Sequence, residues 1–359
     1  MFNMKKHNFS AGPCVLPKEV FQKSSDAILN FNKLNLSIIE ISHRSKDFVA
    51  VMNKTINLVK ELLNVPNGYS VLFLQGGASL QFCMIPYNFL TKKGKATYVE
   101  TGTWAKKAAK EAKLFGNTEI VASSANNNFN YIPKNYIVDE NSDYLHLTSN
   151  NTIVGTQIKK FPSIKIPIIC DMSSDIFSKK IDVSKFGLIY AGAQKNMGPA
   201  GATLIIIRDD LLGHVDREIP TMLNYQTHID KESMFNTPPV FSIYASMLTL
   251  EWLKKNGGVD WIEKVNNKKA SMMYQEIDRN ALFCGTAKTE DRSTMNATFL
   301  LTQASLKSEF ELACKNEGIN GINGHRSVGG YRASMYNALS KESVEKLIEI
   351  MQKLEKKYT

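Results

Sequence analysis

The chain has 359 residues, of which 43% are hydrophobic and 22% are charged, and its formal net charge is +10. This composition excludes a disordered chain and a small disulfide-stapled domain, because so long and apolar a chain buries a large core. The length is typical of about two domains. The positive charge leaves nucleic acid, an anionic surface and small anionic substrates open as partners.

Cysteine and histidine spacing bears on compartment and metal binding. The five cysteines are scattered and form no CxxC pair, so we expect free thiols in a reducing cytosol. The histidines form no HxxxH or HExxH pattern, and no metal is expected. Residues 1–10 lack the apolar stretch of a signal peptide, and no apolar run is long enough to cross a bilayer. These features predict a cytoplasmic protein without membrane association.

Short apolar runs alternate with helical segments along the first two thirds of the chain. We predict helices at 79–89 and 104–115 and strands at 70–74, 96–99, 166–170, 188–191 and 202–207. Strands that are apolar throughout and alternate with helices indicate a mostly parallel sheet covered on both faces. The sequence therefore predicts an α/β fold for this part.

A second unit follows the helix predicted at 244–255, which ends at a Gly-Gly pair. It contains a strand at 297–301, a helix at 308–317 and a closing helix after Ser340. One face of that last helix carries Val344, Leu347, Ile348, Met351 and Leu354. We predict a large α/β domain over residues 16–258 and a smaller α+β domain over 259–359, against which residues 1–15 pack.

The first chemical feature is the segment 73–79, Phe-Leu-Gln-Gly-Gly-Ala-Ser, in which a strand runs into two glycines and then a helix. Glycines let a ligand approach the backbone, and free N–H groups at a helix start attract phosphate. The segment matches neither GxGxxG nor GxxxxGK[ST], so a dinucleotide site and a P-loop are not indicated. An ordinary strand-to-helix turn is the alternative interpretation.

The second feature joins the ends of two predicted strands. The strand at 166–170 ends in Asp171, and Lys195 follows a later strand in a loop rich in small residues. In a parallel sheet, ligands bind at the carboxyl ends of the strands. The two residues could form a simple buried ion pair. They are also the pair that a pyridoxal phosphate site needs, because a carboxylate keeps the pyridine nitrogen protonated and an amine forms the Schiff base. Spacing alone leaves both interpretations open.

Residues 191–201, Ala-Gly-Ala-Gln-Lys-Asn-Met-Gly-Pro-Ala-Gly, resemble the lysine motif of the phosphoserine aminotransferase family. The segments 8–13, 42–45, 102–104, 236–239 and 324–334 resemble that family too, and the matches run in order from residue 8 to about 337. The resemblance implies a fold-type I, class-V aminotransferase that depends on pyridoxal 5'-phosphate. It implies a homodimer whose subunits have a large domain with a mostly parallel, seven-stranded type of sheet and a smaller C-terminal α+β domain.

The resemblance also implies roles for individual residues. Lys195 matches the catalytic lysine that binds the cofactor covalently, and Asp171 matches the partner of the pyridine nitrogen. Trp104 matches the aromatic residue that stacks on the cofactor ring; without the resemblance, a core anchor would be the simpler interpretation. The other matched cofactor contacts are Ala78 and Ser79 at the phosphate, Thr152 and Gln194, and Asn236 and Thr237, which reach the phosphate from the other subunit.

The implied substrate-binding residues are Ser10, the pairs His43-Arg44 and His325-Arg326, and Arg332. An isolated arginine is usually a solvated surface residue, but an arginine fork also binds carboxylate and phosphate bidentately. In the family, the counterpart of Arg44 binds the glutamate carboxylate, and the later residues engage the substrate phosphate. This chain departs from some bacterial members of the family at Ser79, where those members carry an arginine. One candidate phosphate ligand is therefore missing from this chain.

The implied reaction is the transfer of an amino group from glutamate to 3-phosphonooxypyruvate, which gives phosphoserine. The family also implies a parallel role in pyridoxine synthesis on a phosphorylated hydroxythreonine. Two alternatives remain open. One is another class-V enzyme, either an aminotransferase acting on serine, alanine or glyoxylate or a cysteine desulfurase. The other is a basic nucleic-acid-binding module, which needs a basic stripe interleaved with aromatic residues. Here the lysines instead lie along helices beside glutamates, as in 342–357.

Overall fold

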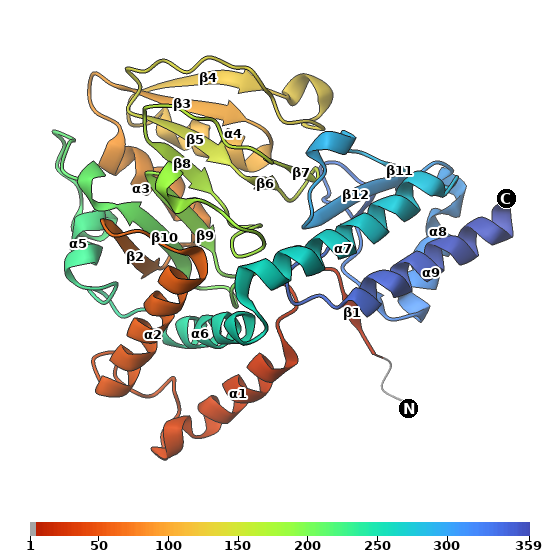
Figure 1. The fold of residues 1–359 in the computed structure, drawn as a ribbon, viewed down its shortest axis with the longest axis horizontal. Coiled ribbons are helices and arrows are strands. Elements are labelled where there is room, and N and C mark those ends of the chain that lie inside the picture. The colour runs from red at the N-terminus through yellow and green to blue at the C-terminus, as the bar shows by residue number, and fades with distance from the viewer. Residues whose placement is uncertain (1–4) are drawn as a thin grey trace.

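A computed structural model describes residues 5–359, and its largest element is a seven-stranded sheet (Figure 1). The strand order is β2 (Tyr69–Leu74), β10 (Thr203–Arg208), β9 (Leu188–Gly192), β8 (Ile168–Asp171), β5 (Tyr144–Thr148), β3 (Lys95–Glu100) and β4 (Asn117–Ser123). Strand β10 is antiparallel to both of its neighbours, and the pairs from β9 to β4 are parallel. The predicted mostly parallel sheet is confirmed.

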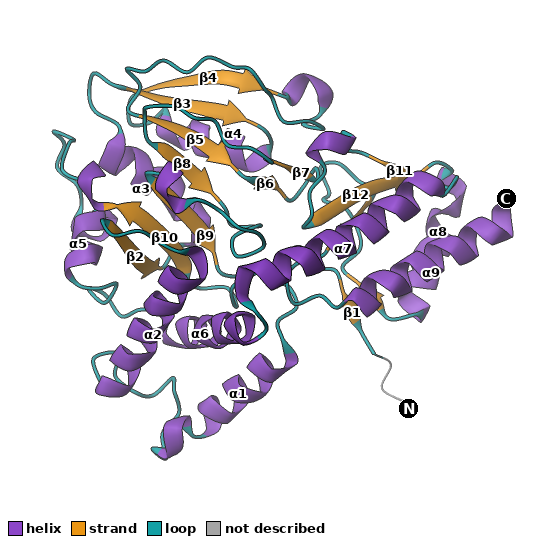
Figure 2. Cartoon of the chain, viewed as in Figure 1, coloured by secondary structure: helices purple, strands orange, loops and turns teal. Residues whose placement is uncertain are grey.

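Helices cover both faces of this sheet (Figure 2). Along β10, Leu204 and Ile206 join one hydrophobic cluster, whereas Ile205 and Ile207 join another, because successive side chains of a strand point to opposite faces. The first cluster includes side chains of α1 (Lys18–Leu29), α2 (Lys46–Leu63) and α6 (Val240–Lys255). The second includes side chains of α3 (Gly77–Phe89), α4 (Thr103–Ala112) and α5 (Tyr225–Asp230).

The C-terminal unit has its own sheet and core. Strands β11 (Phe283–Gly285), β12 (Asn296–Leu301) and β14 (Tyr331–Ser334) pair antiparallel, next to α7 (Gly258–Arg279), α8 (Lys307–Asn316) and α9 (Lys341–Tyr358). Near the N-terminus, β1 (His7–Asn8) pairs with β13 (Ile319–Asn320). A short hairpin, β6 (Asn150–Asn151) with β7 (Thr156–Gln157), lies beside the large sheet. On α9, four of the five predicted apolar residues are buried and Ile348 is partly buried.

Helix α7 connects the two units. Val259 and Ile262 in its first turns belong to the core of the large unit, whereas Ala270, Met273 and Ile277 belong to the core of the C-terminal unit. Phe9 also lies in the C-terminal core, although it comes from the start of the chain. The predicted division at residues 258 and 259 stays a prediction, and the shared helix is the reason that a single boundary residue is hard to assign. Within residues 5–359, every helix is too short or too polar to cross a membrane.

A buried lysine fixes the turn between β14 and α9. The Nζ atom of Lys269, which is fully buried on α7, donates hydrogen bonds to the carbonyl oxygens of Met335, Tyr336 and Leu339 at 3.0, 2.8 and 3.1 Å. The same turn contacts the large unit, because the backbone N–H of Asn337 donates to Asn196 Oδ1 at 3.0 Å. The C-terminal unit therefore holds the residue that directly follows Lys195.

A histidine lies inside the large sheet. His146 on β5 is 1% exposed, and its Nε2 lies 2.9 Å from the hydroxyl of Tyr190. Its Nδ1 has no hydrogen-bond partner among residues 5–359. Burial lowers the pKa of this imidazole to about 3, because the charged ring would lose its hydration.

This histidine makes folding stability depend on pH. In the unfolded chain, His146 binds a proton below its ordinary pKa of 6.5. In the folded chain, it binds this proton only below its lowered pKa of about 3. Stability from this group is therefore complete above pH 6.5 and is lost as the pH falls, by about 2 kcal/mol between pH 7 and pH 5. In urea unfolding, H146N should lose about that much less stability over this interval than the wild type. Equal pH slopes for the two proteins would contradict the assignment.

Candidate active site

The candidate site lies where the parallel strands of the large sheet end (Figure 1). Asp171 is the last residue of β8, and Lys195 follows β9 in the adjoining loop. Thr152 directly follows β6, which comes after β5, and Trp104 lies in the first turn of α4, directly after β3. Ala78 lies in the first turn of α3, directly after β2. The parallel arrangement brings these residues, far apart in sequence, to one edge of the sheet.

These residues line one cavity of about 340 Å³. Nine of the predicted site residues lie in its wall: Ala78, Ser79, Trp104, Thr152, Asp171, Gln194, Lys195, His325 and Arg332. Seven come from the large unit, and His325 and Arg332 come from the C-terminal unit. The cavity is therefore lined by residues of both units.

The Asp171 carboxylate and the Lys195 amine influence each other within this cavity. Burial raises the pKa of Asp171, and hydrogen bonds from Ser173 and the charge of Lys195 oppose that rise. Burial likewise lowers the pKa of Lys195, and the charge of Asp171 opposes the fall, whereas Arg332 adds to it. Desolvation destabilises both charged forms, so each charge offsets part of the cost of the other.

Ser173 fixes the Asp171 carboxylate. Its backbone N–H donates to Asp171 Oδ1 at 2.9 Å, and its hydroxyl accepts a hydrogen bond from the backbone N–H of Gly192 at 3.1 Å. One residue thereby links the end of β8 to the end of β9, which leads to Lys195. Sequence reasoning missed Ser173, because a serine two positions after a strand has no pattern of its own.

The N-terminal segment covers Lys195. The thiol of Cys14 donates to the backbone carbonyl of Lys195 at 2.7 Å, and the hydroxyl of Tyr336 donates to the carbonyl of Ala11 at 2.8 Å. A Cβ atom on Gly12 would lie 3.3 Å from Lys195 Cγ, so glycine allows this close approach, and its φ of +134° also favours glycine. The amine of Lys195 donates to Thr152 Oγ1 at 3.2 Å. The lysine is thus enclosed on its stem and directed into the cavity.

The remaining walls fit the predicted cofactor, pyridoxal phosphate. Thr148 Oγ1, Trp104 Nε1 and Arg332 Nε belong to lining residues and are buried without a hydrogen-bond partner among residues 5–359. The N-cap residue of helix α3 is Gly76 (φ +84°), which has no side chain to cap the helix, so the first N–H groups of α3 are available to an anion. An amine, a carboxylate, an aromatic ring and an uncapped helix start are the groups that an aldehyde-bearing pyridine phosphate requires.

Six predicted residues lie outside this wall. Ser10 lines a neighbouring cavity that shares Ala11 and Arg332 with the first, and Arg326 is exposed beside His325. His43 is half-buried and Arg44 is exposed, just before α2. Asn236 and Thr237 are exposed and are bound to Gln75, whose side chain accepts from Asn236 Nδ2 at 3.0 Å and donates to the Thr237 carbonyl at 2.7 Å.

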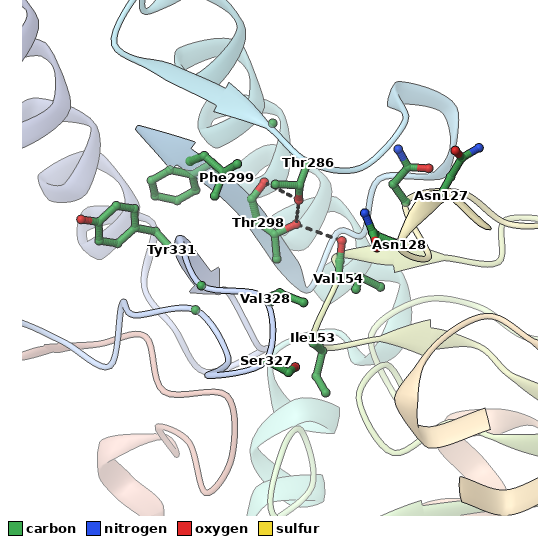
Figure 3. A pocket seen from close by; sticks show the side chains of 15 residues that line it. Asn127, Asn128, Ile153, Val154, Thr286, Thr298, Phe299, Ser327, Val328 and Tyr331 are labelled. Atoms are coloured by element: carbon green, nitrogen blue, oxygen red, sulfur yellow. Dashed lines mark hydrogen bonds between the residues drawn. The ribbon is translucent and has the colours of Figure 1, made fainter. Parts of the chain in front are cut away.

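A second cavity of about 470 Å³ adjoins the site and shares Ile153 with it (Figure 3). It lies between Asn127 and Asn128 of the large unit and the 324–330 loop of the C-terminal unit. In the wall of this cavity, the hydroxyl of Thr298 in the C-terminal unit donates a hydrogen bond to the carbonyl of Val154 in the large unit at 3.0 Å. Among residues 5–359, none that lines this cavity has a charged side chain. Asp171, Lys195 and Arg332 instead line the cavity described above.

Comparisons with known proteins agree with this geometry. Residues 6–347 match the family described as aminotransferase class-V. The chain is 61% identical to a phosphoserine aminotransferase of Flavobacterium psychrophilum over 99% of this chain and 100% of the relative. Its structure is similar to that of phosphoserine aminotransferase from Bacillus circulans subsp. alkalophilus (TM-score 0.96, 45% identity, 99% of both chains). It is also similar to the PLP-bound enzyme from Trichomonas vaginalis (TM-score 0.92, 35% identity, 97% and 100% covered).

The coupling of Asp171 and Lys195 is testable without any ligand. Because the carboxylate raises the pKa of Lys195, D171N should lower that pKa and increase the fraction of neutral amine. Lys195 of the cofactor-free variant should then react several-fold faster with an acylating reagent at pH 8, as measured by peptide mass spectrometry. The exposed residue Asp216 supplies the control, D216N, which should react like the wild type. A slower reaction in D171N than in D216N would contradict the coupling.

Proposed function

The chain belongs to the class-V aminotransferase family, and we propose that it transfers the amino group of glutamate to 3-phosphonooxypyruvate, which gives O-phosphoserine and 2-oxoglutarate. It is a transaminase that depends on pyridoxal 5'-phosphate. Removal of the phosphate from the product would give serine, so the reaction serves serine biosynthesis. The observation that carries the proposal is the placement of Lys195 and Asp171 in one cavity that also contains His325 and Arg332.

Three groups of the chain would hold the cofactor. Asp171 would face the ring nitrogen of the cofactor. The positive charge of that nitrogen, when protonated, would lower the pKa of the Asp171 carboxyl, which burial raises. Trp104 would lie against the ring, and the start of α3 at Ala78 and Ser79 would receive the phosphate. Thr152 and Gln194 would complete the wall. When bound, the cofactor supplies an aldehyde carbon for the amino group and a ring that withdraws electrons from the substrate.

Lys195 would move the proton of the reaction. Burial lowers the pKa of its amine, so a larger fraction is neutral near pH 7 than for an exposed lysine. A neutral Nζ would take the proton from the substrate Cα. It would then return this proton to the carbon that is bonded to the other side of the transferred nitrogen. Thr152 Oγ1, 3.2 Å from Nζ, keeps the amine directed into the cavity during this transfer.

The cations near the mouth would select the substrates. Both substrates carry an α-carboxylate and a second acidic group, and guanidinium forks bind such groups bidentately. Arg332 lines both the site and the cavity that contains Ser10, so these two residues would receive one acidic end. His325 and Arg326 would receive the phosphate.

We further propose that the active form is a homodimer. Asn236 and Thr237 are exposed and lie outside the cavity of their own chain, and the neighbouring Phe235 is 39% exposed. Aromatic residues are enriched at protein interfaces, so Phe235 supports a partner on this surface. In the proposed dimer, Asn236 and Thr237 reach the cofactor phosphate of the other subunit. Arg44, which is also exposed and outside its own cavity, would reach the substrate carboxylate in the same way.

The five cysteines are all free, which supports a reducing compartment, and we propose the cytoplasm.

The first test replaces the catalytic lysine. K195A should lower the rate of amino transfer from glutamate by about 10³-fold or more, because the proton carrier and the covalent anchor are both lost. The purified variant should also lose the yellow colour that attachment of the cofactor gives. The wild type should act on phosphoserine much faster than on alanine, which separates the proposal from an alanine-specific class-V enzyme. Retained activity in K195A, or a preference for alanine, would refute it.

The second test addresses the shared site. K195A and the double variant N236A/T237A should each be nearly inactive as homodimers. Co-expressed chains should recover about a quarter of the wild-type activity, because half of the dimers are mixed and one of the two sites in each is intact. Mixed dimers that are isolated by two affinity tags and stay inactive would show that Asn236 and Thr237 serve their own chain.

A further inference from the structure

A lysine that neither the sequence motifs nor the family resemblance singles out lies beside the candidate site. Lys107 is on α4, one helical turn after Trp104, and residues three apart in a helix are neighbours on its surface. The Nζ atom of Lys107 lies 4.7 Å from the centroid of the Trp104 ring. Trp104 lines the cavity that contains Lys195, and Lys107 lies beside Trp104 without itself lining that cavity.

Lys107 belongs to a group of positive charges around one imidazole. Burial lowers the pKa of His325, and the charges of Arg332, Arg326 and Lys107 lower it further, in that order. Three cations from two separate units of the chain therefore act on one side chain. Like charges repel each other, so this arrangement is unfavourable unless an anion joins it.

These cations lack acidic partners. Among residues 5–359, Lys107, Arg326 and Arg332 form no salt bridge, although many surface lysines pair with a neighbouring glutamate or aspartate. Lys107 is exposed and has a flexible stem, so its ammonium can follow a ligand at the rim. A cluster of unpaired cations at the mouth of a cavity is typical of an anion-binding site.

We propose that Lys107 is a specificity-determining residue whose ammonium group binds the phosphate of the substrate, together with His325 and Arg326. This rests on the proposed function and adds a ligand at the same site. A phosphate monoester carries between 1.5 and 2 negative charges near neutral pH, roughly twice the charge of a carboxylate. Lys107 therefore favours the phosphorylated substrate over glutamate by charge.

The test compares the two half-reactions of K107M. The ratio kcat/KM should fall about tenfold for phosphoserine and only about threefold for glutamate, because the lost energy scales with the ligand's charge. The effect should lie mainly in KM, and K107R should restore most of it. Lys106 is the matched control, since it is the adjacent exposed lysine of the same helix, and K106M should change neither ratio by more than about twofold.

A second readout needs no cofactor or turnover. In an NMR titration of the cofactor-free protein, the pKa of His325 should rise in K107M and stay unchanged in K106M. Equal losses for both substrates, or equal effects of K107M and K106M, would overturn the proposal. If the wild type transfers no amino group to or from phosphoserine while the His325 pKa still shifts in K107M, then the proposed function fails and the placement of Lys107 stands.

Discussion

The structure of the site depends on the burial of two opposite charges at neighbouring strand ends. Asp171 closes β8 and Lys195 follows β9, and desolvation acts against the charged form of each. An isolated buried ion costs several kcal/mol, and the opposite charge of the other residue offsets part of that cost for each of them. Together they keep a carboxylate and an amine with a lowered pKa at one edge of the sheet. That pairing is the requirement of a cofactor with a basic ring nitrogen and an aldehyde.

The C-terminal unit keeps this pair in place. Lys269 binds three carbonyl groups of the turn after β14, and Asn337 and Tyr336 of that turn contact Asn196 and Ala11. Asn196 directly follows Lys195, and Ala11 belongs to the segment that covers Lys195. A buried lysine that satisfies three acceptors at once makes the turn rigid. The C-terminal unit thus fixes the loop of Lys195, and it also contributes His325 and Arg332 to the wall of the cavity.

Much of this could be predicted from the sequence, and the exceptions have physical causes. Wholly apolar strands, such as β10, were predicted because burial on both faces leaves an unbroken apolar run. Strand β5 escaped prediction because His146 interrupts its apolar pattern, and the Tyr190 hydroxyl and the stacked Tyr98 ring accommodate that histidine in the core. Strand β4 escaped because it lies at the sheet edge and is half-exposed and polar. The roles of Ser173 and Lys107 could not be predicted, because each depends on residues that are distant in the sequence, Gly192 for Ser173 and His325 for Lys107.

The positive side chains behind the net charge of +10 fall into two groups, which differ in whether they form ion pairs with acidic side chains. Along α9 and its neighbours, lysines form ion pairs with glutamates, as Lys341 does with Glu345, and such exposed pairs contribute little to stability. The cations near the site are different, because Lys107, Arg326 and Arg332 have no acidic partner within residues 5–359 and converge on His325. Their mutual repulsion is a cost in the ligand-free protein. In the proposed function, a bound dianion would remove that cost, so the same cations would both attract a phosphorylated substrate and make its binding selective.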